Sequence, residues 1–365
     1  MRRWAEGKMI YGTILLLALL FSGTAVGRAR DEAEGGTWYT LIDEQGNVIL
    51  ETGDPVHTGD VYITAENERY VVQQVEDRTG ICRYEGQEAM PVLPPPVQRQ
   101  GLLGDGEKPP VIGIYHTHDD ESYVPSDGTE SIRGDGGIYD VGAVLKDELE
   151  KMGFEVLYSE AKHDPHDVNA YNRSRETAAS LMREGGDILI DVHRDAVPPE
   201  NYETEVDGEA ATKIKLVVGQ SNPNEQRNME FAKTVKAAMD ETAPGLSAGI
   251  YEGRGDYNQD LTPQAILIEV GAHTNRKEEA EKGAVAFARA LPAALGTAEE
   301  AEKASSSNPG GTESSGTAEA PGEEKAPEAK PLETGEQRKT GHAGLFLGAA
   351  AAIAGAVWFV TRART

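Results

Sequence analysis

The stretch Ala265-Ile266-Leu267-Ile268-Glu269-Val270-Gly271 decides the fold, because it is apolar at almost every position apart from Glu269. A short, continuously apolar run of this kind is typical of a strand that is buried on both faces of a sheet. Similar runs occur at residues 111–115, 155–158, 188–192 and 213–218. Amphipathic segments typical of helices occur at residues 141–151, 171–183, 224–239 and 277–291, the last of which we expect to end at Pro292. Strands that alternate with helices predict an α/β fold over residues 110–296, with a twisted parallel or mixed sheet flanked by helices.

The segment before this domain has a different pattern. Residues 36–90 alternate apolar and polar positions between turn-forming residues, as at Val61 and Ile63. This alternation predicts short antiparallel strands, and therefore a small β module ahead of the α/β domain. Residues 91–109 contain a run of prolines and are expected to form a stiff linker.

Both ends of the chain carry segments typical of exported or membrane-attached proteins. Residues 1–30 place basic residues before an uncharged, leucine-rich stretch, which predicts an export signal or a membrane anchor. Residues 343–360 are apolar and are followed by arginines, which predicts a transmembrane helix with its C-terminus inside. Residues 297–342, dominated by small, polar and acidic residues, predict a disordered acidic linker. We therefore expect attachment to the cell membrane through one or two helices, with the catalytic domain extracytoplasmic.

The composition narrows the chemistry that the chain can perform. A formal net charge of -27 argues against a nucleic-acid partner, because the field of the protein would repel phosphate. The one cysteine, Cys82, excludes an intramolecular disulfide and any metal site built from several cysteines. A metal ion would have to be held by histidines and carboxylates.

Polar side chains stand at the ends of three predicted strands. His116 and His118 directly follow the first strand of the α/β domain, His193 follows the strand at residues 188–192, and Glu269 lies at the end of the stretch quoted above. In open α/β sheets, ligands bind at the carboxyl ends of the strands. The sequence therefore predicts that these side chains share one site.

Zinc is the metal that this set of side chains favours. In hydrolases it usually has three histidine or carboxylate ligands and one open position. We predict Zn²⁺ binding by His116, Glu121 and His193, with His118 and Asp195 as alternative ligands or as hydrogen-bond partners of the ligands. Partial burial at the end of an apolar strand would raise the pKa of Glu269 and suit it to act as the catalytic general base.

Four segments, in this order along the chain, carry a resemblance to a known family: residues 115–123 (YHTHDDESY), 191–196 (DVHRDA), 258–261 (NQDL) and 265–271 (AILIEVG). Over residues 110–295 the chain resembles the stage II sporulation protein P family, which is similar in turn to zinc-dependent N-acetylmuramoyl-L-alanine amidases. The resemblance implies an amidase-3-like sheet, zinc on the 116–118 loop and on His193, and catalysis by Glu269. In the amidases the ligand glutamate follows the first histidine at a longer spacing, which Glu130 meets better than Glu121. Either glutamate therefore stays a candidate for the metal ligand.

The resemblance also implies a function. It is cleavage of the amide bond between N-acetylmuramic acid and L-alanine in peptidoglycan, with cleavage of peptide crosslinks as a further activity. The setting would be engulfment during sporulation, alongside a partner protein that cleaves the denuded glycan, or other cell-wall remodelling. Two alternatives are a zinc carboxypeptidase-like peptidase on the same kind of sheet and a catalytically idle module that binds the cell wall.

Overall fold

The computed structural model describes residues 37–94, 108–167 and 169–296. The predicted N-terminal signal or anchor, the acidic linker and the C-terminal transmembrane helix lie outside these residues, as does most of the proline-rich linker. Among the helices in the described ranges, none has the length and apolarity needed to cross a membrane.

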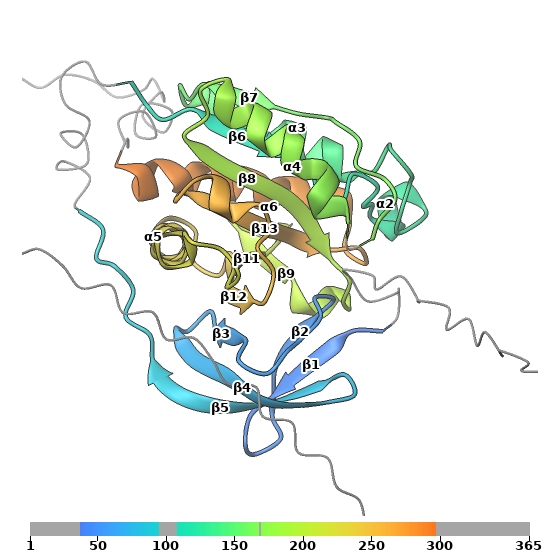
Figure 1. Cartoon of the computed structure of the whole chain (residues 1–365), viewed down its shortest axis with the longest axis vertical. Helices are drawn as coiled ribbons and strands as arrows, with labels where there is room; N and C mark the ends of the chain where they lie inside the picture. The colour runs from blue at the N-terminus through green and yellow to red at the C-terminus, as the bar shows by residue number, and fades with distance from the viewer. Residues whose placement is uncertain (1–36, 95–107, 168, 297–365) are drawn as a thin grey trace, which may run out of the picture. The chain divides into compact units, whose positions relative to one another are not determined.

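Within these ranges, eleven strands form one sheet in the order β2-β1-β5-β4-β3-β12-β11-β13-β8-β6-β7 (Figure 1). The first five strands are β1 (Tyr39–Ile42), β2 (Val48–Thr52), β3 (Val61–Ile63), β4 (Glu68–Glu76) and β5 (Thr79–Gln87). The others are β6 (Ile112–Tyr115), β7 (Val156–Tyr158), β8 (Ile188–Asp195), β11 (Ile214–Gly219), β12 (Ser247–Gly253) and β13 (Ala265–Ala272). A separate hairpin is formed by β9 (Glu203–Val206) and β10 (Glu209–Thr212).

The sheet is mixed, which confirms the predicted fold class. The neighbouring strands β13, β8, β6 and β7 run parallel to one another. β11 runs antiparallel to β13 and parallel to β12. The carboxyl ends of β6, β8 and β13 therefore meet at one edge of the sheet, and the beginning of β11 lies beside them.

Helices cover both faces of the sheet. The five α-helices of the described residues are α2 (Val124–Asp127), α3 (Ile138–Lys151), α4 (Ala170–Arg183), α5 (Glu225–Thr242) and α6 (Lys277–Leu295). Side chains of α3, α5 and α6 pack on one face, against apolar residues such as Ile190, Leu216 and Ile268. On the opposite face, α4 packs against Leu189 and Ala265. This burial of apolar surface on both faces is the main stabilising contribution to the domain.

Strands β1–β5 form the β module, which continues the sheet. β3 pairs antiparallel with β12, placing Ile63 opposite Ile250. The module also packs against the face of the sheet that carries α4, where Val217, Tyr251 and Leu267 join its apolar side chains. The division of the chain into a β module, a linker and a catalytic domain stays a prediction.

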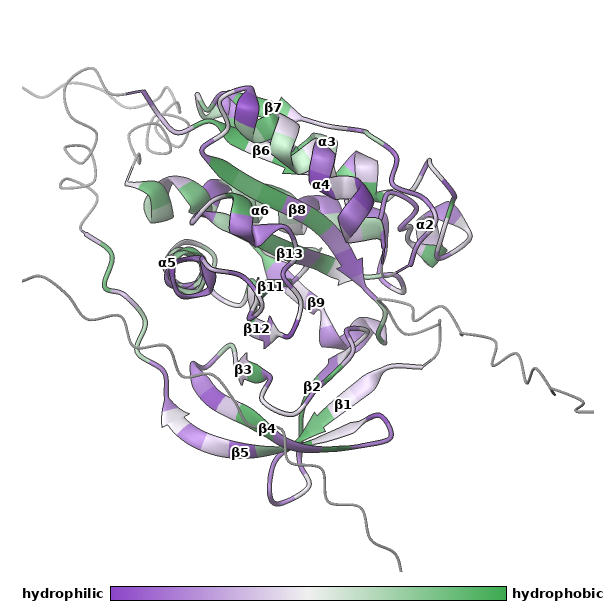
Figure 2. Cartoon of the chain, in the orientation of Figure 1, coloured by the Kyte–Doolittle hydropathy of each residue, from purple (hydrophilic) through white to green (hydrophobic). Residues whose placement is uncertain are grey.

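The bounds of several predicted helices and strands differ from those in the structure. The helix expected to end at Pro292 continues to Leu295, because a proline so close to the end removes only one helical hydrogen bond and its neighbours Leu291 and Ala293 are buried. The strand expected at residues 188–192 extends to Asp195, so that His193 lies within it. Figure 2 shows β8 changing from hydrophobic to hydrophilic toward its C-terminal end.

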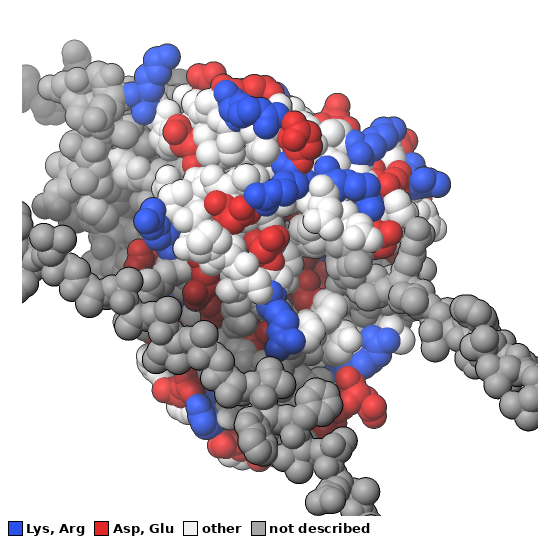
Figure 3. Space-filling model, in the orientation of Figure 1, with Lys and Arg blue, Asp and Glu red and all other residues white. Residues whose placement is uncertain are grey.

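Exposed charges of opposite sign are interspersed over the α3 and α4 side of the molecule (Figure 3). On α3, for example, Lys146 Nζ lies 2.7 Å from Glu150 Oε2. Such exposed pairs contribute little to stability, because water screens both charges. They show that acidic and basic side chains neighbour one another here although the whole chain has an excess of acid.

Candidate metal and catalytic site

Three neighbouring strands place ionisable side chains in one row. His193 on β8 is opposite Glu269 on β13, and Glu269 is opposite Lys215 on β11. Residues that are directly opposite in a sheet point to the same face. That face is the one on which α4 and the β module pack, so the row lies between them.

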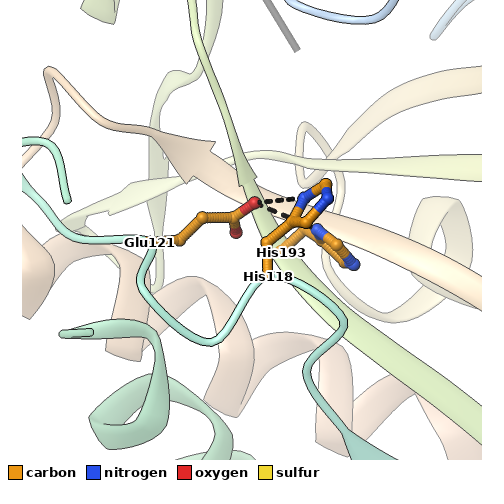
Figure 4. Close-up of side chains that lie close together, drawn as sticks. All are labelled: His118, Glu121 and His193. Carbon is orange, nitrogen blue, oxygen red and sulfur yellow. Dashed lines mark hydrogen bonds and ion pairs between the residues drawn. The ribbon is translucent and has the colours of Figure 1, made fainter. Parts of the chain in front are cut away.

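His118, Glu121 and His193 converge beside this row, and we call them the His–Glu–His group (Figure 4). The Nδ1 atoms of His118 and His193 lie 3.0 and 3.1 Å from the same oxygen, Oε1 of Glu121. One ligand atom from each residue lies within 4.8 Å of the others, and all three side chains are buried. Two imidazole nitrogens and one carboxylate oxygen form a donor set found in catalytic zinc sites, so these residues could hold Zn²⁺.

Further contacts orient this group. The backbone N–H of Arg194 donates to Oε2 of Glu121 at 2.8 Å. Nε2 of His193 lies 3.0 Å from Oδ1 of Asp191. Asp191 is itself fixed by Thr117, whose backbone N–H and hydroxyl donate to it at 2.8 and 2.6 Å. A carboxylate on the far nitrogen of a ligand histidine sets its ring orientation and tautomer.

The charges of the group depend on one another. Burial favours neutral forms, but the carboxylates of Asp191 and Glu121 raise the pKa of His193 well above its ordinary value. Burial also favours the neutral form of Glu121, but the positive charges of His193 and Arg194 outweigh it and lower the pKa of Glu121 well below the usual range. Without a metal, Glu121 is therefore ionised and His193 is protonated, so that their opposite charges offset each other.

The structure places His118 in this group and His116 outside it. Nδ1 of His116 lies 3.0 Å from the carbonyl oxygen of Val192, and Nε2 lies 3.2 Å from the hydroxyl of Tyr158. Complete burial lowers the pKa of His116 to about 4, which keeps the ring neutral. Its two nitrogens are thus engaged in holding the loop against β8 and β7.

Glu130 and Asp195 also lie outside the His–Glu–His group. The side chain of Glu130 is 50% exposed, and its Oε2 lies 3.9 Å from Nε2 of His273. Asp195 is buried among donors: the backbone N–H of Gly53 donates to Oδ1 at 2.7 Å, and Lys215 Nζ donates to Oδ2 at 2.6 Å. The hydroxyl of Tyr202 donates to the same Oδ2 at 2.8 Å.

Glu269 is buried at the centre of the row. Burial raises its pKa well above the ordinary value, and the positive charges of Lys215 and His193 oppose that effect. No described residue forms a hydrogen bond with its Oε2 atom. A buried carboxylate with an available oxygen next to a candidate metal group is suited to accept and return a proton.

A pocket of about 350 Å³ opens onto these residues. Glu269 and the His–Glu–His group line it on the side of the sheet. The other walls come from α4, from the loop after β12 and from the β module, through Tyr171, Arg254 and Asp54 among others. The site is therefore reachable by a substrate, and three separate parts of the chain enclose it.

Sequence reasoning missed two neighbours of the site. The ring of His166 stacks on that of His118, with centroids 3.8 Å apart and an interplanar angle of 19°, although it comes from a turn remote from any strand end. Its Nδ1 lies 3.0 Å from Oδ1 of Asp120. Lys215 could have been identified from the sequence as a candidate site residue, because it is a charged residue inside an apolar strand, as Glu269 is.

The fold and the site together define a mixed α/β protein with a buried two-histidine, one-glutamate donor set at the carboxyl ends of parallel strands. The family model for Stage II sporulation protein P (SpoIIP) matches residues 56–292. The chain belongs to this family, as the sequence motifs predicted.

Relatives and solved structures were also found. The stage II sporulation protein P of Bacillus subtilis (strain 168) is 28% identical over 197 residues, which are 49% of this chain and 49% of that protein. The chain thus spans about half the length of the curated relative it matches. The CwlD amidase of Clostridioides difficile, solved in complex with the GerS lipoprotein, is 14% identical to this chain in sequence. The two structures align with a TM-score of 0.35 over 52% of this chain and 96% of the CwlD chain. The catalytic domain of CwlV, an N-acetylmuramoyl-L-alanine amidase from Bacillus (Paenibacillus) polymyxa var. colistinus, is 16% identical to this chain in sequence. The alignment has a TM-score of 0.33 and covers 51% of this chain and 96% of the CwlV chain.

Proposed function

We propose that this protein is a zinc-dependent peptidoglycan hydrolase that cleaves the amide bond between N-acetylmuramic acid and L-alanine. The observation that carries the proposal is the buried His–Glu–His group beside Glu269 in a pocket. Membership of the stage II sporulation protein P family supports the same function. A hydrolase needs a polarised carbonyl, an activated water and a proton donor for the leaving amine, and the site offers groups for each task.

The chain's own residues divide this work. His118, Glu121 and His193 would hold Zn²⁺, which supplies Lewis-acid polarisation of the scissile carbonyl when bound. Asp191 and the backbone N–H of Arg194 keep His193 and Glu121 in the orientation required of ligands. Glu269 takes the proton of the attacking water and returns it to the leaving amine. Its burial supports this role, because a raised pKa lets a carboxyl group hold a proton between the two steps.

The cellular setting is part of the proposal. The relative from Bacillus subtilis is named for stage II of sporulation, and we propose that this chain remodels the cell wall at that stage. Its substrate would be peptidoglycan outside the cytoplasm, reached from a membrane anchor formed by residues 1–30, by residues 343–360 or by both. A protein that cleaves the denuded glycan is the partner we propose.

The test is digestion of purified peptidoglycan by the full chain with zinc, followed by mass spectrometry of the products. We expect free stem peptides that begin with L-alanine. His193→Ala and Glu269→Gln should release none, and Glu76→Gln, on the exposed end of β4, should act like the wild type.

Each other outcome contradicts the proposal in its own way. Products cut within the peptide would identify a peptidase instead. Wall binding by a metal-free protein that releases nothing would identify a binding module. Undiminished release by both active-site variants would mean that the chemistry takes place elsewhere.

A further inference from the structure

The ammonium group of Lys215 is completely enclosed, with a relative exposure of 0%. An ammonium group has three N–H donors. Three acceptors surround Nζ: Oδ2 of Asp195 at 2.6 Å, the hydroxyl oxygen of Thr52 at 2.7 Å and Oδ2 of Asp54 at 3.1 Å. Each donor of Lys215 therefore has an acceptor, and two of the three acceptors belong to the segment at the end of β2.

The same segment also contacts the partner of Lys215. The backbone N–H of Gly53 donates to Oδ1 of Asp195 at 2.7 Å. The backbones approach so closely here that a Cβ atom on Gly53 would lie 2.8 Å from Cβ of Ala196. Residues 52–54 thus hold both members of a buried ion pair that lies on the catalytic sheet.

This ion pair lies next to the proposed general base. Lys215 is opposite Glu269 in the β11–β13 register, so the two side chains share a face of the sheet. Even so, within the described residues the ammonium group of Lys215 bonds to the three acceptors above and not to Glu269, and Oε2 of Glu269 has no hydrogen-bond partner there. An ammonium group released from its acceptors would be drawn to that carboxylate, because attraction between charges is strong in a buried setting. A lysine bound to Glu269 would occupy the oxygen that must accept the proton of water.

We propose that Thr52 and Asp54 are positioning residues of the active site: they hold the ammonium group of Lys215 away from Glu269 and so keep that carboxylate available. The inference rests on the proposed function. It makes the β module a working part of the active site, since the module supplies two of the three acceptors. The site of the hydrolase then extends from the ends of β6, β8 and β13 to the end of β2.

Paired variants of the full chain test this inference. Thr52→Val keeps the shape of the buried side chain and removes the acceptor, while Thr52→Ser keeps the acceptor and removes a methyl group. Asp54→Ala and Asp54→Asn form a second pair, in which only asparagine keeps an acceptor oxygen. The assay measures kcat and KM for release of stem peptide from a defined muropeptide, together with bound zinc and the melting temperature.

We expect Thr52→Val and Asp54→Ala to lower kcat by about tenfold or more, with KM and zinc content unchanged, because a general base contributes roughly 10²–10⁴ to the rate. Thr52→Ser and Asp54→Asn should stay within about threefold of the wild type, well inside that contribution. A packing role would give the opposite order at position 52, since serine leaves a void and valine does not. Wild-type kcat in Thr52→Val, or an equal loss in Thr52→Ser, overturns the inference.

A crystal structure of Thr52→Val tests the same point without an assay. Lys215 Nζ should move to within about 3.2 Å of Glu269, a hydrogen-bonding distance. An ammonium group that stays on Asp54 and Asp195 in this variant contradicts the inference even if the protein proves to have another activity. An inactive wild type, by contrast, counts against the proposed function alone.

Discussion

Nε2 of His193 lies 3.0 Å from Oδ1 of Asp191, which stands two residues earlier on the same face of β8. We predict that Asp191→Asn weakens zinc binding by about 10–100-fold, the usual effect of removing a carboxylate that orients a ligand histidine. Competition with a chelating dye measures the affinity. Asp147→Asn, on the exposed surface of α3, is the control and should bind zinc as the wild type does. Equal affinities for both variants would show that Asp191 has no such role.

The choice of ligands gives a second prediction. His118→Ala and Glu121→Gln should each lose the bound zinc, because each removes one of three converging donors. Glu130→Gln should keep it, since that side chain is half exposed and lies apart from the group. Zinc content after purification, determined by elemental analysis, separates these outcomes. Loss of zinc in Glu130→Gln with retention in Glu121→Gln would reverse the assignment.

The pH dependence of zinc binding follows from the charges of the group. Neighbouring carboxylates raise the pKa of His193, and a metal can bind only the deprotonated ring, so protons compete with zinc. Affinity should therefore increase with pH by up to about tenfold per unit while His193 is still protonated in the metal-free protein. The lowered pKa of Glu121 keeps that ligand ionised throughout, so it adds no dependence. Affinities measured between about pH 6 and pH 8 check this, and a flat profile would contradict it.

Glu252, at the end of β12, gives a prediction about stability. Burial, together with a hydrogen bond to Glu225, raises its pKa from 4.5 to about 7. The folded state therefore keeps a proton that the unfolded chain loses, so the free energy of unfolding falls as pH rises from 4.5 to about 7. Glu252→Gln mimics the protonated group and should be more stable than the wild type above this range, by on the order of 2 kcal/mol.

Denaturant unfolding at about pH 5 and pH 8 tests the prediction for Glu252, because the difference between the two proteins should be larger at the higher pH. Glu76→Gln serves as a matched control on the exposed end of β4. A stabilisation of the same size at both pH values would mean that the glutamine acts through packing and not through the proton.

Much of the fold could be predicted from the sequence because apolar runs and helical periodicity dominate it. The strands that hold His193 and Glu269 were identified in this way, and the sheet is of the mixed type that was expected. β12 was missed because its sequence, Ser247-Ala248-Gly249-Ile250-Tyr251-Glu252-Gly253, has only two large apolar residues between glycines. Its pairing with β3 and β11, and not its own pattern, makes it a strand.

The site was harder to predict than the sheet. His116 and His118 stand two residues apart after the same strand, and their order gives no indication of which ring turns toward Glu121. That depends on the carbonyl of Val192 and the hydroxyl of Tyr158, which hold His116 elsewhere and come from distant parts of the chain. The contacts of the β module with Lys215 were equally invisible, because they join residues more than a hundred positions apart.

The pairing of β3 with β12 has a consequence for the aggregation of truncated forms of the chain. Without β1–β5, β12 would become a border strand with unsatisfied backbone N–H and C=O groups, and Val217, Tyr251 and Leu267 would face water. An unpaired border strand beside exposed apolar side chains is a template on which further chains can add strands. Fragments that begin after the module should therefore associate through their sheets, so that strands β1–β5 protect the rest of the sheet against aggregation.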